Sequence, residues 1–227
     1  MAESKRLVWD DVGEKLYETG TDRGVLYRID EQNKYSKGYA WNGLTAFNAQ
    51  PSGADTTDLW ANNTKYLSMT AAEQFGATIE AYTFPEEFRD CDGSKEIMPG
   101  VYAGQQNRVP FGFTARTLIG NDTKDTEYGY KIHMVYGAKA QPSEKSYSTV
   151  NESPEAITLS WTISTTPIPF TKIPDMNFKN MSYIEIVSTK IDKDKLKKLE
   201  DALYGTESTD PYLPTPDELY DLLTAEG

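Results

Sequence analysis

His133 and Cys91 are the only histidine and the only cysteine in this chain, and these two residue types most often do chemistry near neutral pH. His133 lies in "KIHMVY", within a predicted strand. A histidine that acts as a general base or metal ligand needs partners, and no second histidine accompanies it. Cys91 lies between Asp90 and Asp92, whose negative charge disfavours the thiolate. We therefore interpret His133 as an ordinary strand residue and Cys91 as an unreactive thiol.

The acidic stretch "DCDGSKE", which begins at Asp90, resembles the start of a calcium-binding loop. Its glycine is at the fourth position rather than the sixth, and Val101 stands where the bidentate glutamate should be. The stretch is therefore predicted to be a tight turn. The spacing of the acidic residues does not single out a catalytic pair of carboxylates. GxSxG, Walker, GxGxxG and paired CxxC motifs are absent from the sequence. We expect no catalytic residue, no metal site and no cofactor, and hence a protein that is not an enzyme.

The chain has 227 residues, 12 % aromatic content and a net charge of −12, a composition typical of a folded, acidic protein. Half of that net charge comes from the segment after Gly205, which has six acids and no lysine or arginine. The absence of a basic cluster argues against tight binding to nucleic-acid phosphates. A lone cysteine, an N-terminus without an apolar stretch and the lack of long apolar runs predict assembly in the cytoplasm, without a signal peptide or a membrane span.

The dominant hydrophobic period is two, which predicts β-strands. In "AITLSWTIST", Ile157, Leu159, Trp161 and Ile163 share one face, and the hydroxyl residues between them share the other. Comparable alternation predicts strands within residues 24–30, 38–47, 75–84, 110–120, 131–136 and 182–189. The sequence thus predicts a β domain of roughly seven to nine strands.

Helices are predicted to be few. Residues 83–90 predict one short turn that begins at Pro85, and "DKDKLKKLEDALYG" predicts a helix capped by Asp192 or Asp194 and ended by Gly205. A second helix, capped by Thr215, carries a leucine stripe that needs a surface on the same subunit or on another. We divide the chain into a β domain with an N-terminal arm, 1–205, and an acidic C-terminal arm, 206–227. The long stretch 48–63 is predicted to be a loop with a function.

Several long strings in the chain resemble a known family. They include "YSKGYAWNGLTAFNAQPSGADTTDLWANNTKYLSM", "EQFGATIEAYTFPEEFRDCDGS" and "GQQNRVPFGFTARTLIGNDTKDTEYGYKIHMVYGAKAQPSEKSYSTVNESPEAITLSWTIST". In this order, from about Val8 to about Gly205, they are similar to the major tail protein of siphophages, the subunit of the tail tube. The segment from Thr206 onward lies outside the similarity.

The resemblance implies a mainly β fold: a tail-tube domain like a β-sandwich or barrel with a short flanking helix, plus a C-terminal amphipathic helix on an acidic arm. It further implies hexameric rings in which each subunit gives two hairpins to a shared inner barrel, and rings stacked into a tube. Roughly 24 strands at about 4.8 Å spacing and about 40° tilt give a backbone diameter of roughly 48 Å, which leaves room for a DNA duplex.

The implied setting is the virion tail, assembled in the host cytoplasm. The implied partners are copies of the chain itself, a tape-measure protein in the lumen, the tail-terminator protein and the distal-tail or baseplate proteins. Double-stranded DNA would pass through without specific binding during genome ejection, and no membrane contact is implied. An acidic wall rich in hydroxyl groups would let DNA slide, whereas a basic wall would trap it.

These expectations lead to residue-level hypotheses. The hairpin around His133 would be a tile of the shared barrel. The side chains expected to face the lumen are Glu80, Thr158, Ser160 and Thr162. A slip of one residue in register would invert that assignment. Apolar residues on polar segments are frequently interface anchors; those expected between subunits or rings are Leu7, Val8, Trp9, Leu59, Trp60, Leu219, Tyr220, Leu222 and Leu223. The alternative for Trp9 and Trp60 is that they fold back onto their own subunit.

Two other functions fit parts of the same pattern. One is the tube of a contractile bacteriocin or of a secretion-type injection machine. The other is a soluble carbohydrate-binding β-sandwich that uses exposed aromatic residues such as Tyr39, Trp41 and Tyr128.

Overall fold

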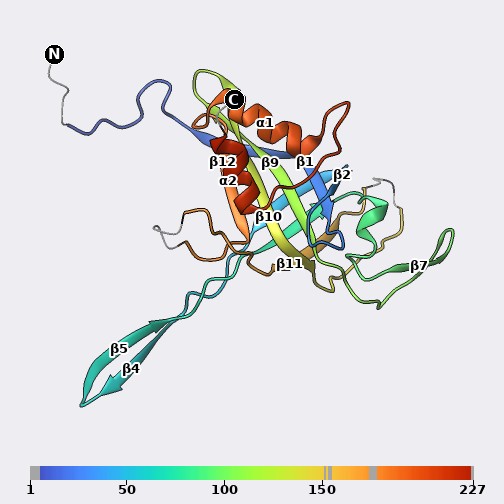
Figure 1. The fold of residues 1–227 in the computed structure, drawn as a ribbon, viewed down its shortest axis with the longest axis horizontal. Helices are drawn as coiled ribbons and strands as arrows, with labels where there is room; N and C mark the ends of the chain where they lie inside the picture. The colour runs from blue at the N-terminus through green and yellow to red at the C-terminus, as the bar shows by residue number, and fades with distance from the viewer. Residues whose placement is uncertain (1–5, 151, 153–154, 174–177, 226–227) are drawn as a thin grey trace.

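The computed structural model describes residues 6–150, 152, 155–173 and 178–225. Residues 1–5 of the predicted N-terminal arm, and Glu226 among the acids of the C-terminal arm, lie outside the described residues. The fold is mainly β, as predicted, with two short helices (Figure 1). Its strands are β1 (Tyr17–Arg28), β2 (Lys37–Trp41), β3 (Leu44–Ala49), β4 (Thr56–Ala61), β5 (Thr64–Thr70), β6 (Gly76–Ala81), β7 (Lys95–Met98), β8 (Val101–Ala103), β9 (Phe111–Asn121), β10 (Asp125–Ala140), β11 (Leu159–Thr165) and β12 (Tyr183–Val187).

One antiparallel eight-stranded sheet forms the body. Its strand order is β2-β1-β9-β10-β11-β6-β3, and β12 pairs with β10 beside that path. β2 and β3 stand at opposite ends of this order, yet only Asn42 and Gly43 separate them in the chain. Gly43 adopts a φ of 70°, a conformation that glycine allows, and its carbonyl accepts a hydrogen bond from the Tyr82 N–H at 2.8 Å. The sheet is therefore curled until its two ends come together, in a barrel-like arrangement.

The inside of this curled sheet is an aromatic core. Trp41 and Trp161 lie 5.4 Å apart in an edge-to-face arrangement, and Phe88, Phe111 and Phe113 surround them. All three phenylalanines and Trp161 are fully buried. Because side chains alternate along a strand, the residues next to Trp161 in the sequence point to the opposite side of the sheet.

A second core lies on the outer side of β10, beneath the two helices. Ile132, Met134 and Tyr136 point into it and meet Leu199 and Leu203 of helix α1 (Lys193–Tyr204). His133 and Val135 point the other way, as the alternation in the sequence predicts, but both are buried as well. The middle of β10 is therefore covered on both faces.

Gly137 lets β10 serve two partners. Before this glycine β10 pairs with β12, through Lys131 to Val135, and after it with β11, through Ala138 to Ala140. Gly137 has a φ of 57°, and a β-carbon there would lie 2.2 Å from the Thr166 carbonyl oxygen. Only glycine fits this bend.

Both helices begin at their predicted capping residues, and α1 also ends at its predicted glycine. The Asp192 side chain accepts hydrogen bonds from the Asp194 and Lys195 N–H groups, at 3.0 and 3.3 Å, and Gly205 ends α1. Thr215 and Glu218 form a capping box at helix α2 (Pro216–Thr224). The predicted short turn near Pro85 is the 3-10 helix η1 (Glu86–Phe88).

The C-terminal segment packs on its own subunit. Leu213 and Leu219 are buried in the second core, and the Pro214 carbonyl accepts a hydrogen bond from the Tyr136 hydroxyl at 2.9 Å. The surface that the leucine stripe needed therefore belongs to the same chain.

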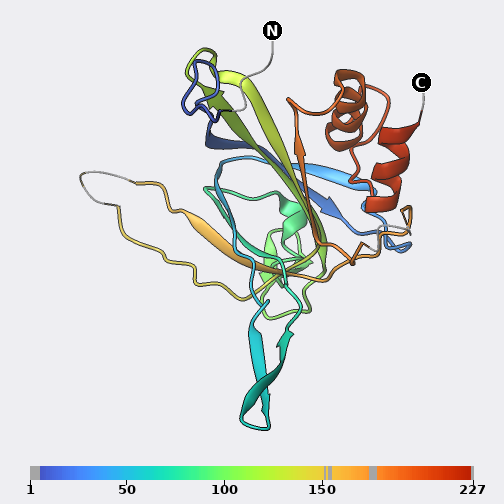
Figure 2. The same cartoon turned by 90° about the vertical axis from the view of Figure 1, so that its left-hand side faces the viewer.

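Two hairpins were not predicted. The prediction of a loop over 48–63 is wrong: the stretch holds β4, which pairs with β5 in a separate two-stranded sheet. The second hairpin, β7–β8, follows the turn at Asp90. In Figures 1 and 2 hairpin β4–β5 projects far from the body, beyond the end of the main sheet.

Candidate assembly surfaces

A polar face covers the outer side of β3, β6 and β11. Ser160 stands opposite Glu80 across the β11–β6 pair, and Thr162 stands opposite Thr78, whose other neighbour is Asn48 on β3. The alternate residues, Ile79 and Trp161 among them, point into the core and are fully buried. The sheet thus brings three of the four predicted lumen residues, Glu80, Ser160 and Thr162, to one face. The fourth, Thr158, is exposed and precedes β11.

This face is hydroxyl-rich rather than acidic. Lys139 of β10 stands opposite Ser164 of β11 on the same side, so its charge balances that of Glu80. The expectation of an acidic wall is therefore too strong for this part of the sheet. The overall acidity of the chain resides elsewhere.

His133 is held by two hydrogen bonds. Its Nε2 lies 2.8 Å from the Thr117 hydroxyl and its Nδ1 lies 2.7 Å from the Tyr183 hydroxyl. Burial lowers its pKa, so the neutral ring is favoured, although the carboxylate of Glu185 opposes the shift. With both ring nitrogens hydrogen-bonded and only 8 % of the residue exposed, His133 is a structural residue of β10. The place of its hairpin in a shared barrel stays a prediction.

The Asp90 stretch is a turn, as predicted. Its Asp92 N–H donates to the Phe88 carbonyl at 2.9 Å, while the Asp92 carboxylate contacts Arg108 and Lys145. Cys91 is fully buried, and burial is the main reason that its pKa is raised to about 12. Across the described residues, no group of three or more histidine, cysteine, aspartate or glutamate side chains is placed to hold a metal ion.

Hairpin β4–β5 is an amphipathic ribbon. Leu59 stands opposite Leu67, and Thr57 opposite Met69, on one face. On the other face Asp58 accepts a hydrogen bond from Ser68 at 2.6 Å and pairs with Lys65 at 2.8 Å. The apolar face is open, because Leu59, Leu67 and Met69 are 42 %, 48 % and 56 % exposed. A single two-stranded ribbon is at best marginally stable in water, so this face calls for a partner.

The two predicted anchors in this hairpin, Leu59 and Trp60, are accompanied by three others that the sequence analysis missed: Tyr66, Leu67 and Met69. A signal for them exists. Asn62 and Asn63 both have positive φ, as a two-residue hairpin turn requires, and Leu67 and Met69 alternate with polar residues just after that turn.

The N-terminal segment presents three predicted anchors to solvent. Leu7, Val8 and Trp9 are 72 %, 63 % and 75 % exposed. Further along, Gly13 is fixed to the β9–β10 turn, because its N–H donates to the Asp122 carboxylate at 3.0 Å. Trp9 is thus exposed, and Trp60 is 69 % exposed, so neither tryptophan folds back onto its own subunit.

The four predicted anchors of helix α2 lie differently. Leu219 is buried, and Leu222 and Leu223 pack at the margin of the second core. Tyr220 meets Phe170 with ring centres 6.0 Å apart. Because these side chains make contacts within their own subunit, we do not include them in a surface that binds another subunit.

Comparisons with known proteins give a distant likeness only. No family model matches the chain, and no curated protein matches it. Among solved structures, one titled as the sheath–tube complex of an extracellular contractile injection system, PVC, in its extended state matches with a TM-score of 0.38 and 14 % identity, over 73 % of this chain and 88 % of that one. A second, titled as the sheath/tube terminator of such a system, has a TM-score of 0.34 and 13 % identity, over 72 % and 93 % of the two chains. At these values the likeness assigns no function.

A bilayer-crossing helix is not found: in the described part of the chain, neither helix is long and apolar enough.

Proposed function

We propose that this chain is the subunit of a self-assembling tube, the tail tube of a siphophage, through which the genome leaves the virion. The observation that carries the proposal is the projecting hairpin β4–β5, whose apolar face has no support from its own subunit. Such a segment is stabilised when copies of the chain meet. The sequence resemblance to siphophage major tail proteins names the kind of assembly.

In the proposed tube, hexameric rings stack through the hairpin and the exposed N-terminal residues Leu7, Val8 and Trp9. The polar face over β3, β6 and β11 lines the lumen, with Glu80, Ser160 and Thr162 toward the channel. A wall of hydroxyl groups with balanced charge gives duplex DNA no array of cations on which to stick. The chain acts as a structural protein, with no catalytic step and no cofactor.

The free edge of β3 suits ring closure. β3 pairs with β6 along one edge, and none of the described strands pairs with its other edge. An open strand edge invites pairing with another chain. In a closed ring a neighbouring subunit covers it, and the exposed row of backbone groups disappears.

A tube of this kind implies several partner proteins for the chain. A tape-measure protein would occupy the lumen during assembly, a terminator would close one end, and distal-tail or baseplate proteins would start the other. The tube would be assembled in the host cytoplasm and end in the virion.

Negative-stain electron microscopy of the purified chain, alone and with its tail-tip partners, tests the proposal. Hollow tubes built of stacked rings are expected. Monomers under both conditions would overturn it and make glycan binding the next function to test. A sheath protein that co-purifies with the tube would replace the siphophage tail with a contractile machine.

A further inference from the structure

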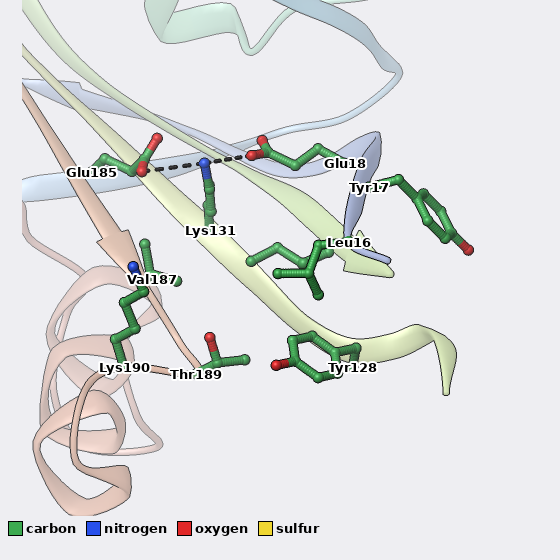
Figure 3. Close-up of a pocket in the computed structure, with 10 residues that line it drawn as sticks. Leu16, Tyr17, Glu18, Tyr128, Lys131, Glu185, Val187, Thr189 and Lys190 are labelled. Carbon is green, nitrogen blue, oxygen red and sulfur yellow. Dashed lines mark ion pairs between the residues drawn. The ribbon is translucent and has the colours of Figure 1, made fainter. Parts of the chain in front are cut away.

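A groove lies at the end of the body where β1 and β10 begin. It encloses about 630 Å³, and its apolar lining comes from Leu16, Ile119, Tyr128 and Val187 (Figure 3). Lys131 stands in the middle, 2.5 Å from Glu18 and 3.3 Å from Glu185, as the dashed lines in Figure 3 show. Leu16 is 57 % exposed, so part of this apolar lining is left for a partner to cover.

The groove and hairpin β4–β5 lie at opposite ends of the molecule. The groove includes Lys131 of β10. The hairpin emerges next to Gly76 of β6, which stands opposite Ser164 of β11, and Ser164 in turn stands opposite Lys139 of β10. At a rise of about 3.3 Å per residue, these two places on β10 are roughly 26 Å apart. Figure 2 shows the hairpin at the bottom of the molecule and the β9–β10 turn, beside the groove, at the top. The hairpin therefore cannot reach the groove of its own subunit.

The two surfaces match in chemistry. Hairpin residues 56–70 carry two charged side chains, Asp58 and Lys65, which neutralise each other in an ion pair. The charged side chains of the groove, Glu18, Glu185, Lys131 and Lys190, are balanced too. Copies of a chain with a net charge of −12 repel one another, so contacts between neutral, partly apolar patches oppose association least.

Resting on the proposed tube, we propose that this groove receives the apolar face of hairpin β4–β5 from a copy in the neighbouring ring. A projection at one end and a receiving site at the other make a head-to-tail contact, which repeats without limit along one direction. Leu59 and Leu67 cover the apolar lining around Leu16 and Val187. Lys131 keeps its ion pairs with Glu18 and Glu185, so the contact does not bury this ammonium group without a partner.

Cross-linking between two variants, each with one added cysteine, tests the contact. Leu67→Cys and Val187→Cys chains are mixed, assembled and treated with a short bis-maleimide. A covalent heterodimer is expected, because the two thiols come from different copies. The matched control replaces Val187→Cys by Val101→Cys, which lies on hairpin β7–β8 and is 46 % exposed, and should give no heterodimer. The native Cys91 is buried and serves as an internal blank.

The outcomes separate this inference from the proposed function. Tubes that form without the Leu67–Val187 cross-link overturn the groove contact and leave the tube standing. A cross-link from Trp9→Cys to Val187→Cys in place of it would assign the groove to the N-terminal segment and overturn the inference as well. A wild-type chain that never assembles contradicts both proposals.

A charge exchange gives a second test. Val187→Glu and Leu67→Lys should each abolish tube formation while the monomer keeps its β circular dichroism, and the double variant should restore tubes. Restoration by the double variant is the result that a merely structural role of either residue would not produce. Folded single variants that still assemble like the wild-type chain would contradict the contact.

Discussion

At the scale of single residues, the chain's potential chemical groups are held in inert states. His133 uses both ring nitrogens in hydrogen bonds to Thr117 and Tyr183. The Cys91 thiol is enclosed in the aromatic core. Each state has a measurable consequence.

The buried His133 predicts a loss of stability at mildly acidic pH. Its folded-state pKa is lowered, mainly by burial, while the unfolded chain keeps an ordinary value of about 6.5. Below that pH the unfolded state binds the proton more readily, so the stability present above about 6.5 is lost as pH falls through the folded pKa. Glu18 and Glu185 favour the charged ring and Lys131 opposes it, and none of them outweighs burial.

Urea unfolding at pH 7.5 and pH 5.5 checks this prediction in the wild type and in His133→Asn. The wild type should lose more unfolding free energy between the two conditions than the variant. Equal losses would contradict the account of His133.

Cys91 is predicted to resist thiol reagents. Because burial raises its pKa to about 12, little thiolate forms near neutral pH, and the sulfur is also out of reach. Its reaction with a disulfide reagent should become fast only in denaturant, whereas a Leu67→Cys chain should react at once through its new thiol. Fast labelling of native wild-type protein would show that the packing around Cys91 is wrong.

At the scale of elements, the bend in β10 decides how the sheet is put together. Gly137→Ala would place a methyl group against the Thr166 backbone and hold the residue at positive φ. We expect a destabilisation of more than about 1 kcal/mol, measured by chemical denaturation. Gly104→Ala is the matched control, since a β-carbon there meets nothing within 4 Å. Similar stabilities for the two variants would contradict the assigned bend.

Hairpin β4–β5 is predicted to act in assembly and not in folding. Trp60 is 69 % exposed, so Trp60→Ala should change the unfolding free energy by no more than about 0.5 kcal/mol. Tube yield, measured by sedimentation and microscopy, should nevertheless fall. Ile97→Ala on hairpin β7–β8, where Ile97 is 66 % exposed, controls for the loss of any exposed apolar side chain. Undiminished assembly by Trp60→Ala would count against Trp60 as an anchor between rings.

The elements that could be predicted from the sequence are those with one buried face. Trp161 and Ile163 alternate with Ser160 and Thr162, and that pattern gives β11 its correct faces. Asp192 and Gly205 predict the start and end of α1, and Thr215 predicts the start of α2, because capping is a local interaction.

The features that could not be predicted depend on contacts between residues that are far apart in the sequence. The burial of Leu219 requires α1 and β10 to form a core beneath it. Likewise, the cover over His133 comes from Tyr183 and Phe47, which are distant in sequence. Strand β4 could not be predicted because both its faces are exposed in the subunit, so its sequence has no clear alternation of apolar and polar residues.

At the scale of the whole molecule, charge should govern the rate of assembly. Each copy carries a net charge of −12, and like-charged subunits repel over about a Debye length, roughly 8 Å at physiological salt and longer in dilute buffer. Raising the salt concentration from low to physiological should therefore speed tube growth, as followed by light scattering. Tubes that dissociate as salt rises would indicate that ion pairs, rather than the apolar hairpin face, hold the copies together.

In the proposed tube, the polar face of β3, β6 and β11 lines the channel. A cryo-electron microscopy reconstruction of the assembled protein measures this most directly. We expect stacked rings around a channel wide enough for a DNA duplex, with Glu80, Ser160 and Thr162 on the inner wall. A reconstruction in which these three side chains lie on the outer surface, or a protein that stays monomeric with its tail partners present, would contradict it.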